Sequence, residues 1–311
     1  MSRIDCELLI IGAGPAGLSA GLYASRAKVE TVLLERGRPG GQVLTTEWVE
    51  NYPGFPDGIS GPDLAQAFEK HAQRFGLTSE YGQVDRLERE GDVITAFLSD
   101  GKAIRCKAVI LSVGAAFRKL GVTGEAEFSG RGVSYCATCD GPFFGDQEVA
   151  VVGGGNMAVE EGTYLTRFAR HVHIIHRRDK LRADRIIQER AFANDKMVFH
   201  WDSIVTEICG EDGVDKVRLK NVKTGQESEL PVSGVFIFIG VTPNTGFLKG
   251  FVDLDEMGYV ITDGDMVTSV PGVCACGDCR RATGKQAVIA AGEGALAALS
   301  VEQHLESLKD S

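Results

Sequence analysis

The sequence predicts an α/β protein built from two units of the same kind, with the second unit inserted into the first. Three observations lead to this expectation. Two glycine-rich turns, at residues 12–17 and 153–158, each follow an apolar run and precede a helical pattern. A chain of 311 residues is long for one domain. Finally, 39 glycines against 9 prolines fit many tight strand-to-helix turns better than disordered linkers.

The first turn lies in a strand–turn–helix pattern. Residues 7–11 are an apolar run, the segment GAGPAG follows at residues 12–17, and a helical pattern comes next. Such glycines let the backbone approach a pyrophosphate, whose charge then lies at the amides of the helix N-terminus. Residues 29–34 form a second apolar run, which ends in Glu35. A carboxylate at this distance is typical of ribose binding, so the pattern predicts a dinucleotide site.

The same pattern recurs 141 residues later. Residues 148–152 are apolar, and GGGNMA at residues 153–158 forms the second turn. The run that corresponds to residues 29–34 ends in His176 instead of Glu35. Three arginines come next, namely Arg177, Arg178 and Arg182. A carboxylate would repel a ribose 2′-phosphate, whereas guanidinium groups bind it through charge-assisted hydrogen bonds. We therefore expect a second site that prefers NADPH to NADH, with a solvated charge cluster as the alternative.

Further apolar runs place the boundaries between the two Rossmann-like units. Residues 108–113 and 234–239 each resemble the last strand of a nucleotide-binding unit. Later elements fit the first unit better, namely strands at 258–261 and 272–276 and a helix at 286–308. This predicts a discontinuous first domain, residues 1–116 and 246–311, and an inserted second domain, residues 117–245, which carries the expected NADPH site. Two crossings between domains are typical of a hinge.

Composition argues against several functional classes. The net charge of −10 makes a nucleic-acid partner unexpected. No charged and then apolar leader opens the chain, and no apolar run reaches the roughly 18 residues that span a bilayer. We therefore expect a soluble, cytoplasmic protein with no membrane partner. Eight cysteines are too few for a secreted disulfide scaffold, so most should be reduced.

A Cys-x-x-Cys segment, Cys136 to Cys139 followed by Asp140, lies between the two glycine turns. Two thiols at this spacing can close a disulfide, and pairing lowers the pKa of one of them. The adjacent carboxylate can move a proton. The same spacing is also half of a zinc site, so the segment alone leaves metal binding open. Its place between two nucleotide sites favours a redox dithiol.

Three late cysteines are less expected, namely Cys274, Cys276 and Cys279. Cys274 and Cys276 alternate along a short apolar run, and the distance from Cys139 is no local zinc pattern. We expect buried structural thiols, with a further redox role or a metal as alternatives. The histidines other than His176 show no ligand-like spacing, namely His71, His171, His173, His200 and His304.

Together these motifs resemble the low-molecular-weight, bacterial-type thioredoxin reductases, within the FAD/NAD(P)-dependent pyridine nucleotide-disulfide oxidoreductase family. The motifs that carry the resemblance are spread along the chain, at residues 12–17, 40–42, 50–54, 136–141, 153–161, 176–183 and 277–278. The resemblance implies a homodimeric flavoprotein that reduces thioredoxin with NADPH. One departure is Ser112-Val113-Gly114, where the family usually has Ala-Thr-Gly.

The resemblance also implies the residues of both cofactor sites. FAD would lie along Gly12, Gly14, Pro15, Ala16 and Gly17, with Glu35 on its adenosine ribose, Gly41, Gln42 and Asn51 around the pyrophosphate and isoalloxazine, Asp278 near the ribityl chain, and Gln286 and Ala287 at the flavin edge. NADPH would contact Gly153, Gly155, Asn156, Met157 and Ala158, with His176 beside the adenine and Arg177, Arg178 and Arg182 on the 2′-phosphate.

By the same resemblance, hydride passes from NADPH to FAD and the electrons then reduce the Cys136–Cys139 disulfide. Cys139 would face the flavin, Cys136 would attack thioredoxin, and Asp140 would move protons. No metal is expected. One alternative is the same chemistry with another disulfide acceptor, such as a peroxiredoxin-linked carrier or a small-molecule dithiol. Another is a nucleotide-sensing or zinc-binding module without turnover.

Overall fold

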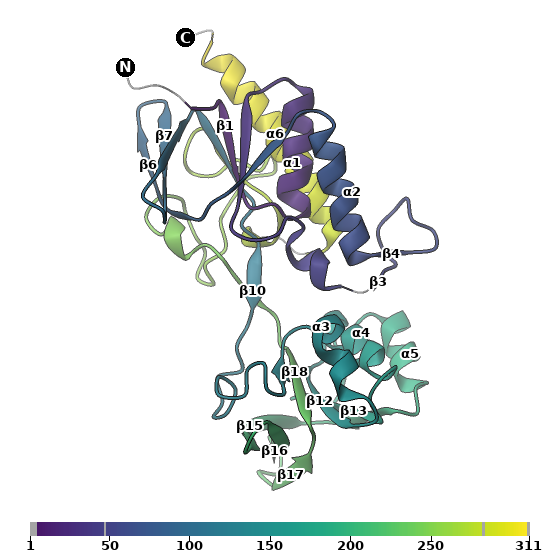
Figure 1. Ribbon diagram of the computed structural model, residues 1–311. Helices are drawn as coiled ribbons and strands as arrows, with labels where there is room; N and C mark the ends of the chain where they lie inside the picture. The colour runs from purple at the N-terminus through teal and green to yellow at the C-terminus, as the bar shows by residue number, and fades with distance from the viewer. Residues whose placement is uncertain (1–4, 47, 282–283, 310–311) are drawn as a thin grey trace. The chain divides into compact units, whose positions relative to one another are not determined.

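The computed structural model describes residues 5–46, 48–281 and 284–309, without the side chains of Thr45, Thr138 and Cys139. The chain divides into two compact units, which Figure 1 shows. Unit 1 is Met1–Ala116 with Thr242–Ser311, and unit 2 is Phe117–Val241. Two strands, β10 (Ala115–Phe117) and β19 (Val241–Pro243), pair where the chain passes between the units.

We expect crossings after residues 116 and 245, and in the structure the chain passes between the units after Ala116 and after Val241. The residues after β19 are bonded to unit 1. Asn244 donates a hydrogen bond from Nδ2 to the carbonyl of Val113 at 2.9 Å, and its amide bonds to Gly114. These contacts join Asn244 to unit 1 rather than to unit 2.

The central sheet of unit 1 has five parallel strands. Their order is β20 (Val273–Ala275), β9 (Ala108–Leu111), β1 (Leu8–Ile11), β2 (Thr31–Glu35) and β5 (Thr78–Tyr81). The edge strand β20 therefore comes from the C-terminal segment. Strand β9 is not the last strand of the sheet in space, because it lies between β1 and β20.

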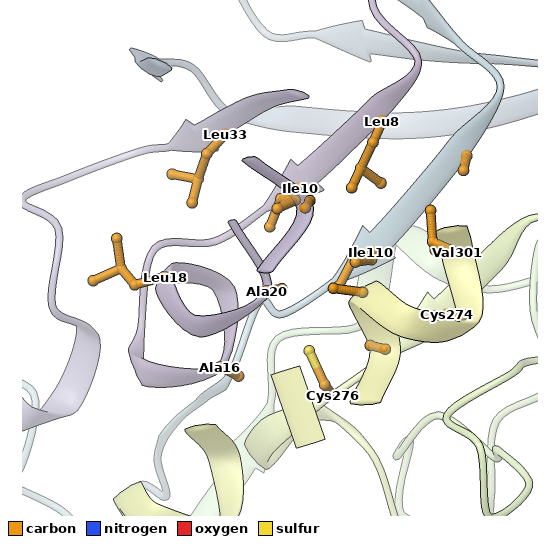
Figure 2. Close-up of a cluster of buried hydrophobic side chains, with 14 of the residues drawn as sticks. Leu8, Ile10, Ala16, Leu18, Ala20, Leu33, Ile110, Cys274, Cys276 and Val301 are labelled. Carbon is orange, nitrogen blue, oxygen red and sulfur yellow. The ribbon is translucent and has the colours of Figure 1, made fainter. Parts of the chain in front are cut away.

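Helices cover one face of this sheet and a small antiparallel sheet covers the other. The helices are α1 (Pro15–Arg26), α2 (Gly61–Gln73) and α6 (Ala287–Ser307), and α1 packs against both others. The antiparallel strands are β6 (Val84–Glu90), β7 (Val93–Leu98) and β8 (Ala103–Cys106). In the helix-side core, Figure 2 shows Leu8, Ile10 and Ile110 of the sheet near Leu18 and Val301. Unit 1 is thus a three-layer, Rossmann-like domain.

Unit 2 repeats this architecture. Its parallel sheet has the order β11 (Val133–Ser134), β18 (Gly234–Phe238), β12 (Glu148–Gly153), β13 (His171–Ile175) and β14 (Met197–His200). Its helices are α3 (Ala137–Asp140), α4 (Asn156–Leu165) and α5 (Arg185–Phe192). An antiparallel sheet follows, made of β15 (Ser203–Gly210), β16 (Val214–Asn221) and β17 (Glu227–Pro231). The predicted fold class of two α/β units is confirmed.

The prediction of a strand at residues 258–261 is wrong. Only isolated bridges join Val260 to Leu254 and to Arg280. The carboxylate of Asp255 accepts hydrogen bonds at 2.9 Å from the amides of both Met257 and Tyr259, which closes a local turn. These amides are therefore unavailable for a strand ladder.

The long C-terminal helix agrees with the expectation to within one residue at each end, since α6 spans Ala287–Ser307. Among residues 5–46, 48–281 and 284–309, no helix has the length and hydropathy that crossing a bilayer requires.

Candidate functional site

The first glycine turn joins β1 to α1 and approaches the end of β9 closely. Gly12 has a φ of +103°, and a Cβ on it would collide with the carbonyl of Ser112. A Cβ on Gly17 would collide in turn with the carbonyl of Gly12. The hydroxyl of Ser112 donates to the carbonyls of Ile11 and Gly12, at 2.9 and 2.8 Å. Ser112, noted above only as a departure from the family, therefore supports the turn. In the sequence, the signal for this supporting role is a hydroxyl residue directly after a buried strand.

The amides at the start of α1 suit an anionic ligand. Gly14 is the N-cap residue, Pro15 begins the helix, and no side chain in the described part of the molecule caps it. A Cβ on Gly14 would have only the Cα of Gly41 within 4.0 Å. This uncapped, open helix N-terminus fits the pyrophosphate of a dinucleotide.

Glu35 lies beside the same turn, as the dinucleotide pattern requires. Its Oε2 accepts a hydrogen bond from the amide of Ala13 at 2.8 Å, and its Oε1 accepts one from Gly37 at 2.9 Å. The carboxylate is therefore held at the end of β2, facing the glycine turn. This position fits an acceptor for ribose hydroxyls.

The second glycine pair of unit 1 packs directly against the first turn. The amide of Gly40 donates to the carbonyl of Ala13 at 2.7 Å, and a Cβ on Gly41 would lie 3.1 Å from the Cα of Gly14. Gln42 follows in a 3₁₀ helix (Gly41–Thr45) and donates from Nε2 to the carbonyl of Ala115 at 3.0 Å. The structure thus brings these predicted site residues together.

Asn51 and Gln286 meet although 235 residues separate them, since Asn51 donates from Nδ2 to Oε1 of Gln286 at 3.0 Å. Gln286 is the N-cap residue of α6 and Ala287 is the first residue of the helix. The predicted flavin-edge residues therefore stand at the start of a 21-residue helix. In the described residues no side chain caps this end either.

Asp278 lies in a 3₁₀ turn (Gly277–Cys279) that α6 holds from one side. Glu293 of α6 accepts hydrogen bonds from the amide of Gly277 at 2.8 Å and from Arg280 at 2.5 Å. Lys285 donates from Nζ to the carbonyls of Asp278 and Arg280, at 3.1 and 2.8 Å. Burial raises the pKa of Asp278, which the charge of Lys285 opposes. The Asp278 carboxyl is thus held on a fixed backbone.

The Cys-x-x-Cys segment follows the short strand β11 of unit 2. Cys136 is disulfide-bonded. Its amide donates to the hydroxyl of Ser134 at 3.0 Å, and that hydroxyl donates to its carbonyl at 3.2 Å. Helix α3 begins at the next residue, and the amide of Asp140 donates to the carbonyl of Cys136 at 3.2 Å. The side chain of Cys139 lies outside the described residues, so its predicted pairing with Cys136 stays a prediction.

The second glycine turn joins β12 to α4 and has the same construction as the first. Gly153 has a φ of +152°, and a Cβ on it would collide with the carbonyl of Phe238. Gly155 is the N-cap residue of α4, and nothing lies within 4 Å of where its Cβ would be. Asn156 begins the helix and exchanges hydrogen bonds of 2.7 and 2.8 Å with Asp184. Met157 is partly exposed and Ala158 is buried.

His176 and Arg182 lie against this second turn. The amide of Arg182 donates to the carbonyl of Gly154 at 2.6 Å. His176 is only 4% exposed, and its Nε2 is buried with no hydrogen-bond partner among the described residues. Burial, together with the charges of Arg182, Arg178 and Arg177, lowers the pKa of His176. A neutral imidazole with an unused nitrogen beside three exposed guanidinium groups fits the adenosine end of a phosphorylated dinucleotide.

Three histidines that sequence spacing leaves ungrouped form a hydrogen-bonded chain in unit 2. Glu148 bonds to Nδ1 of His171 at 3.0 Å and to Nε2 of His173 at 2.8 Å, and Nδ1 of His173 bonds to Nε2 of His200 at 3.0 Å. The three parallel strands β12, β13 and β14 bring them together. Neighbouring strand positions were the signal that could have found this cluster.

The late cysteines Cys274, Cys276 and Cys279 are buried free thiols, as expected. Figure 2 shows Cys274 and Cys276 in the helix-side core of unit 1. Cys279 donates from Sγ to the carbonyl of Leu111 at 3.3 Å. Burial raises the pKa of Cys274 to about 12 and that of Cys279 to about 11. No group of three or more His, Cys, Asp or Glu in the described residues is arranged to hold a metal ion.

The chain is similar to known proteins over nearly its whole length. Residues 6–294 match the family described as pyridine nucleotide-disulphide oxidoreductase. A thioredoxin reductase of Listeria innocua is 48% identical over 309 residues, which are 98% of this chain and 95% of that relative. A thioredoxin reductase of Bacillus subtilis is 47% identical over 306 residues, which are 98% of this chain and 96% of that relative.

Solved structures agree with these sequence relatives. The crystal structure of Lactococcus lactis thioredoxin reductase, in its FR conformation, has a TM-score of 0.95 and 44% identity, and the match covers 97% of this chain and all of that one. The thioredoxin reductase of T. acidophilum has a TM-score of 0.92 and 34% identity over 98% of this chain. The chain therefore belongs to the pyridine nucleotide-disulphide oxidoreductase family and, within it, to the thioredoxin reductases.

Proposed function

We propose that this chain is an NADPH-dependent thioredoxin-disulfide reductase that uses FAD and the Cys136–Cys139 pair. The observation that carries the proposal is the disulfide-bonded Cys136, which lies beside Asp140 in the unit that also holds the basic second glycine turn. A redox dithiol and a site for a phosphorylated dinucleotide in one domain are what electron transfer from NADPH to a disulfide requires.

FAD is assigned to unit 1. The supporting features are the open N-terminus of α1 at Gly14, the Glu35 carboxylate at the same turn, and the Asn51–Gln286 contact at the start of α6. Asp278 precedes Gln286 in the sequence and lies on a turn that hydrogen bonds with Lys285 and Glu293 hold in place. The first turn therefore takes the diphosphate, and the helix start at Gln286 takes the ring system.

NADPH is assigned to unit 2. Gly155 leaves the N-terminus of α4 open, and Asn156 and Asp184 hold the turn beside it. Arg177, Arg178 and Arg182 supply positive charge where unit 1 has Glu35. Guanidinium groups bind a 2′-phosphate through charge-assisted hydrogen bonds, which a carboxylate cannot form.

FAD, when bound, would supply two-electron transfer between NADPH and a disulfide. The Cys136–Cys139 disulfide takes up two electrons and two protons and becomes two thiols. The Cys136 thiolate then attacks one sulfur of the thioredoxin disulfide, which forms a mixed disulfide and releases one thiolate. Cys139 attacks Sγ of Cys136, which restores the intramolecular disulfide and releases the second thiolate. Asp140 accepts and returns the proton of the Cys139 thiol.

The partner, assembly and location are further parts of the proposal. Thioredoxin in its disulfide form is the substrate, a role that rests on the relatives named thioredoxin reductases. A homodimer rests on family resemblance, and a cytoplasmic location rests on composition, since eight cysteines are few for a secreted protein. The net charge of −10 supports the absence of a nucleic-acid partner.

The direct test is NADPH oxidation by the purified, FAD-loaded protein, with and without thioredoxin. Turnover should need thioredoxin, should be faster with NADPH than with NADH, and should be lost in Cys139→Ser. Cys209→Ser is the matched control, because Cys209 is a partly exposed free thiol of the same unit. Bleaching of the flavin by NADPH without thioredoxin reduction would contradict the proposed partner and leave the cofactor assignment standing.

A further inference from the structure

Tyr135 directly precedes Cys136 and is bonded to a buried carboxylate. Its hydroxyl donates a hydrogen bond of 2.5 Å to Oε1 of Glu125. Glu125 is only 4% exposed, which is unusual for a carboxylate. Burial raises the pKa of Tyr135, and the bond to Glu125 raises it further. The phenol therefore stays protonated and donates at neutral pH.

Glu125 keeps its charge despite being buried. Besides Tyr135, the amides of Leu120 and Gly121 donate to its two oxygens at 2.7 and 2.5 Å. Burial alone would raise its pKa, but these three hydrogen bonds and the charge of Lys119 outweigh burial and lower it. A buried, ionised and fully bonded carboxylate holds its donors firmly in place.

The ring of Tyr135 is held by further contacts from the start of unit 2. Phe117 stacks on it, with ring centroids 6.3 Å apart and an interplanar angle of 16°. The ammonium of Lys119 lies 4.9 Å from its centroid. Phe117 is the first residue of unit 2 and belongs to β10, where the chain enters this unit. Tyr135, which precedes Cys136, is thus packed against the residue at which the chain enters unit 2.

The segment that carries Cys136 follows a short strand. Strand β11 is two residues long and pairs through Val133 and Ser134 with β18, and the backbone of Val133 also bonds to Phe128 and Gly130. The hydroxyl of Ser134 bonds to the amide and the carbonyl of Cys136, which fixes the local turn but not its direction. The bond of Tyr135 to the buried Glu125 adds a side-chain anchor directly before Cys136.

We propose that Tyr135 and Glu125 are positioning residues that set the orientation of Cys136 for its exchange with the disulfide substrate. The proposal rests on the thioredoxin-reductase function proposed above. A nucleophile displaced by about 1 Å can lose on the order of 100-fold in rate, so a rigid anchor next to it affects turnover without touching the reacting atoms.

Tyr135→Phe is the sharpest variant, because it keeps the ring that Phe117 and Lys119 contact and removes only the donor to Glu125. Removing one hydrogen bond to a charged group should lower kcat for thioredoxin about tenfold. KM for thioredoxin should change less than about twofold, because the Tyr135 hydroxyl is bonded to the buried Glu125 and not to substrate in this proposal. NADPH-driven reduction of ferricyanide, which takes electrons directly from the flavin, should not change.

Tyr81→Phe is the matched control, because it makes the same chemical change on a tyrosine of unit 1 that is 82% exposed. It should leave every rate unchanged. Glu125→Gln should resemble Tyr135→Phe, and the double variant should be no slower than the slower single variant if both act through one bond. Glu125→Gln can lose stability, so thermal unfolding and FAD content are measured alongside. If Glu125→Gln fails to fold, Tyr135→Phe alone carries the test.

A second measurement needs no thioredoxin. The protein is reduced with dithiothreitol, and the rate at which iodoacetamide alkylates Cys136 is followed against pH. A changed orientation alters the groups around the sulfur, so the apparent pKa should shift in Tyr135→Phe and not in Tyr81→Phe. If the wild-type protein does not reduce thioredoxin, the proposed function is wrong, but the pH profile of alkylation still tests the role of Tyr135 and Glu125. Unchanged kcat and an unchanged profile in Tyr135→Phe would overturn the inference, as would a parallel loss of ferricyanide reduction.

Discussion

The imidazole of His176 occupies the space that a side chain on Gly154 would need. A Cβ on Gly154 would collide with Nδ1, Cε1 and Cγ of His176. The carbonyl of Gly154 also accepts a hydrogen bond of 2.6 Å from the amide of Arg182. The middle glycine of the second turn is therefore the point where the turn, the histidine and the arginine segment are packed against one another.

Gly154→Ala should weaken NADPH binding without affecting FAD. The added methyl group displaces the His176 ring and, with it, the segment that leads to Arg182. Overpacking of this kind costs about 1–3 kcal/mol, so KM for NADPH should rise about 5- to 160-fold. The measurement is KM for NADPH beside the FAD content of the purified variant. Gly145→Ala is a control, since nothing lies within 4 Å of its Cβ position. A normal KM in Gly154→Ala would contradict the assignment of this turn.

Exchange of Arg177 and Arg178 for glutamine should remove most of the preference for NADPH over NADH. Both side chains are exposed and lie after β13. Charge-assisted hydrogen bonds contribute about 1.5–3 kcal/mol each, so KM for NADPH should rise at least about tenfold while KM for NADH stays near its wild-type value. Steady-state kinetics with both coenzymes give the ratio. Lys220→Gln removes an exposed charge of β16 in the same unit and should not alter it. A parallel rise of both KM values would show a structural effect instead.

The chain of histidines on Glu148 should make unit 2 sensitive to acid. Burial and the neighbouring His173 lower the pKa of His200 below its ordinary value of 6.5. The unfolded chain then binds a proton at His200 before the folded protein does, so stability present above pH 6.5 is lost as the pH falls below it. Hydrogen bonds from His171 and His173 outweigh burial and lower the pKa of Glu148, which adds a loss below about pH 4.5.

His200→Phe should therefore flatten the fall of the unfolding temperature between pH 7 and about pH 5.5, since phenylalanine does not titrate. Thermal unfolding over this range is the measurement. His71→Phe, a change at an exposed histidine of α2, is the control and should keep the wild-type slope. An equal slope in His200→Phe would show that this histidine takes no part. His176 and His304, whose pKa values are also lowered, keep their own contributions in both variants.

The three late thiols should be chemically inert in the folded protein. Burial raises the pKa values of Cys274 and Cys279 to about 12 and about 11, so almost no thiolate forms at neutral pH. Maleimide followed by peptide mass spectrometry should label Cys209 first and Cys274, Cys276 and Cys279 only on unfolding. Cys276→Ser should cost about 1–3 kcal/mol of stability by burying a hydroxyl, with unchanged turnover per bound FAD. Lost turnover in this variant would instead support the additional redox role.

Local patterns predicted the two units well because each strand–turn–helix motif is short and its glycines are required by sterics. Gly12 and Gly153 both adopt a positive φ beside a carbonyl that leaves no room for a Cβ. A repeat of the same motif at a fixed offset carries the fold class, since each copy brings its own sheet. The second unit has His176 at the position that corresponds to Glu35 in the first unit, so the charge at this position distinguishes the two sites in the sequence.

Spacing along the chain failed where a side chain bonds the backbone and where distant residues meet. The turn at Asp255 replaced a predicted strand, because a side-chain acceptor satisfied the backbone amides first. The three histidines on Glu148 come together only through strand register. The bond between Glu125 and Tyr135 joins a loop to the residue after a two-residue strand, and no periodicity indicates it.

The position of β20 at the edge of its sheet affects the order in which the two units fold during synthesis. Residues 117–241 are contiguous and emerge from the ribosome before the last strand and helix of unit 1 exist. Helix α1 meanwhile lacks α6, and a Cβ on Gly294 would collide with the carbonyl of Ala16, so the two helices approach backbone to backbone. Unit 1 therefore cannot complete its fold until its final 70 residues are made, and until then one side of β9 and α1 is uncovered. The inserted unit folds first.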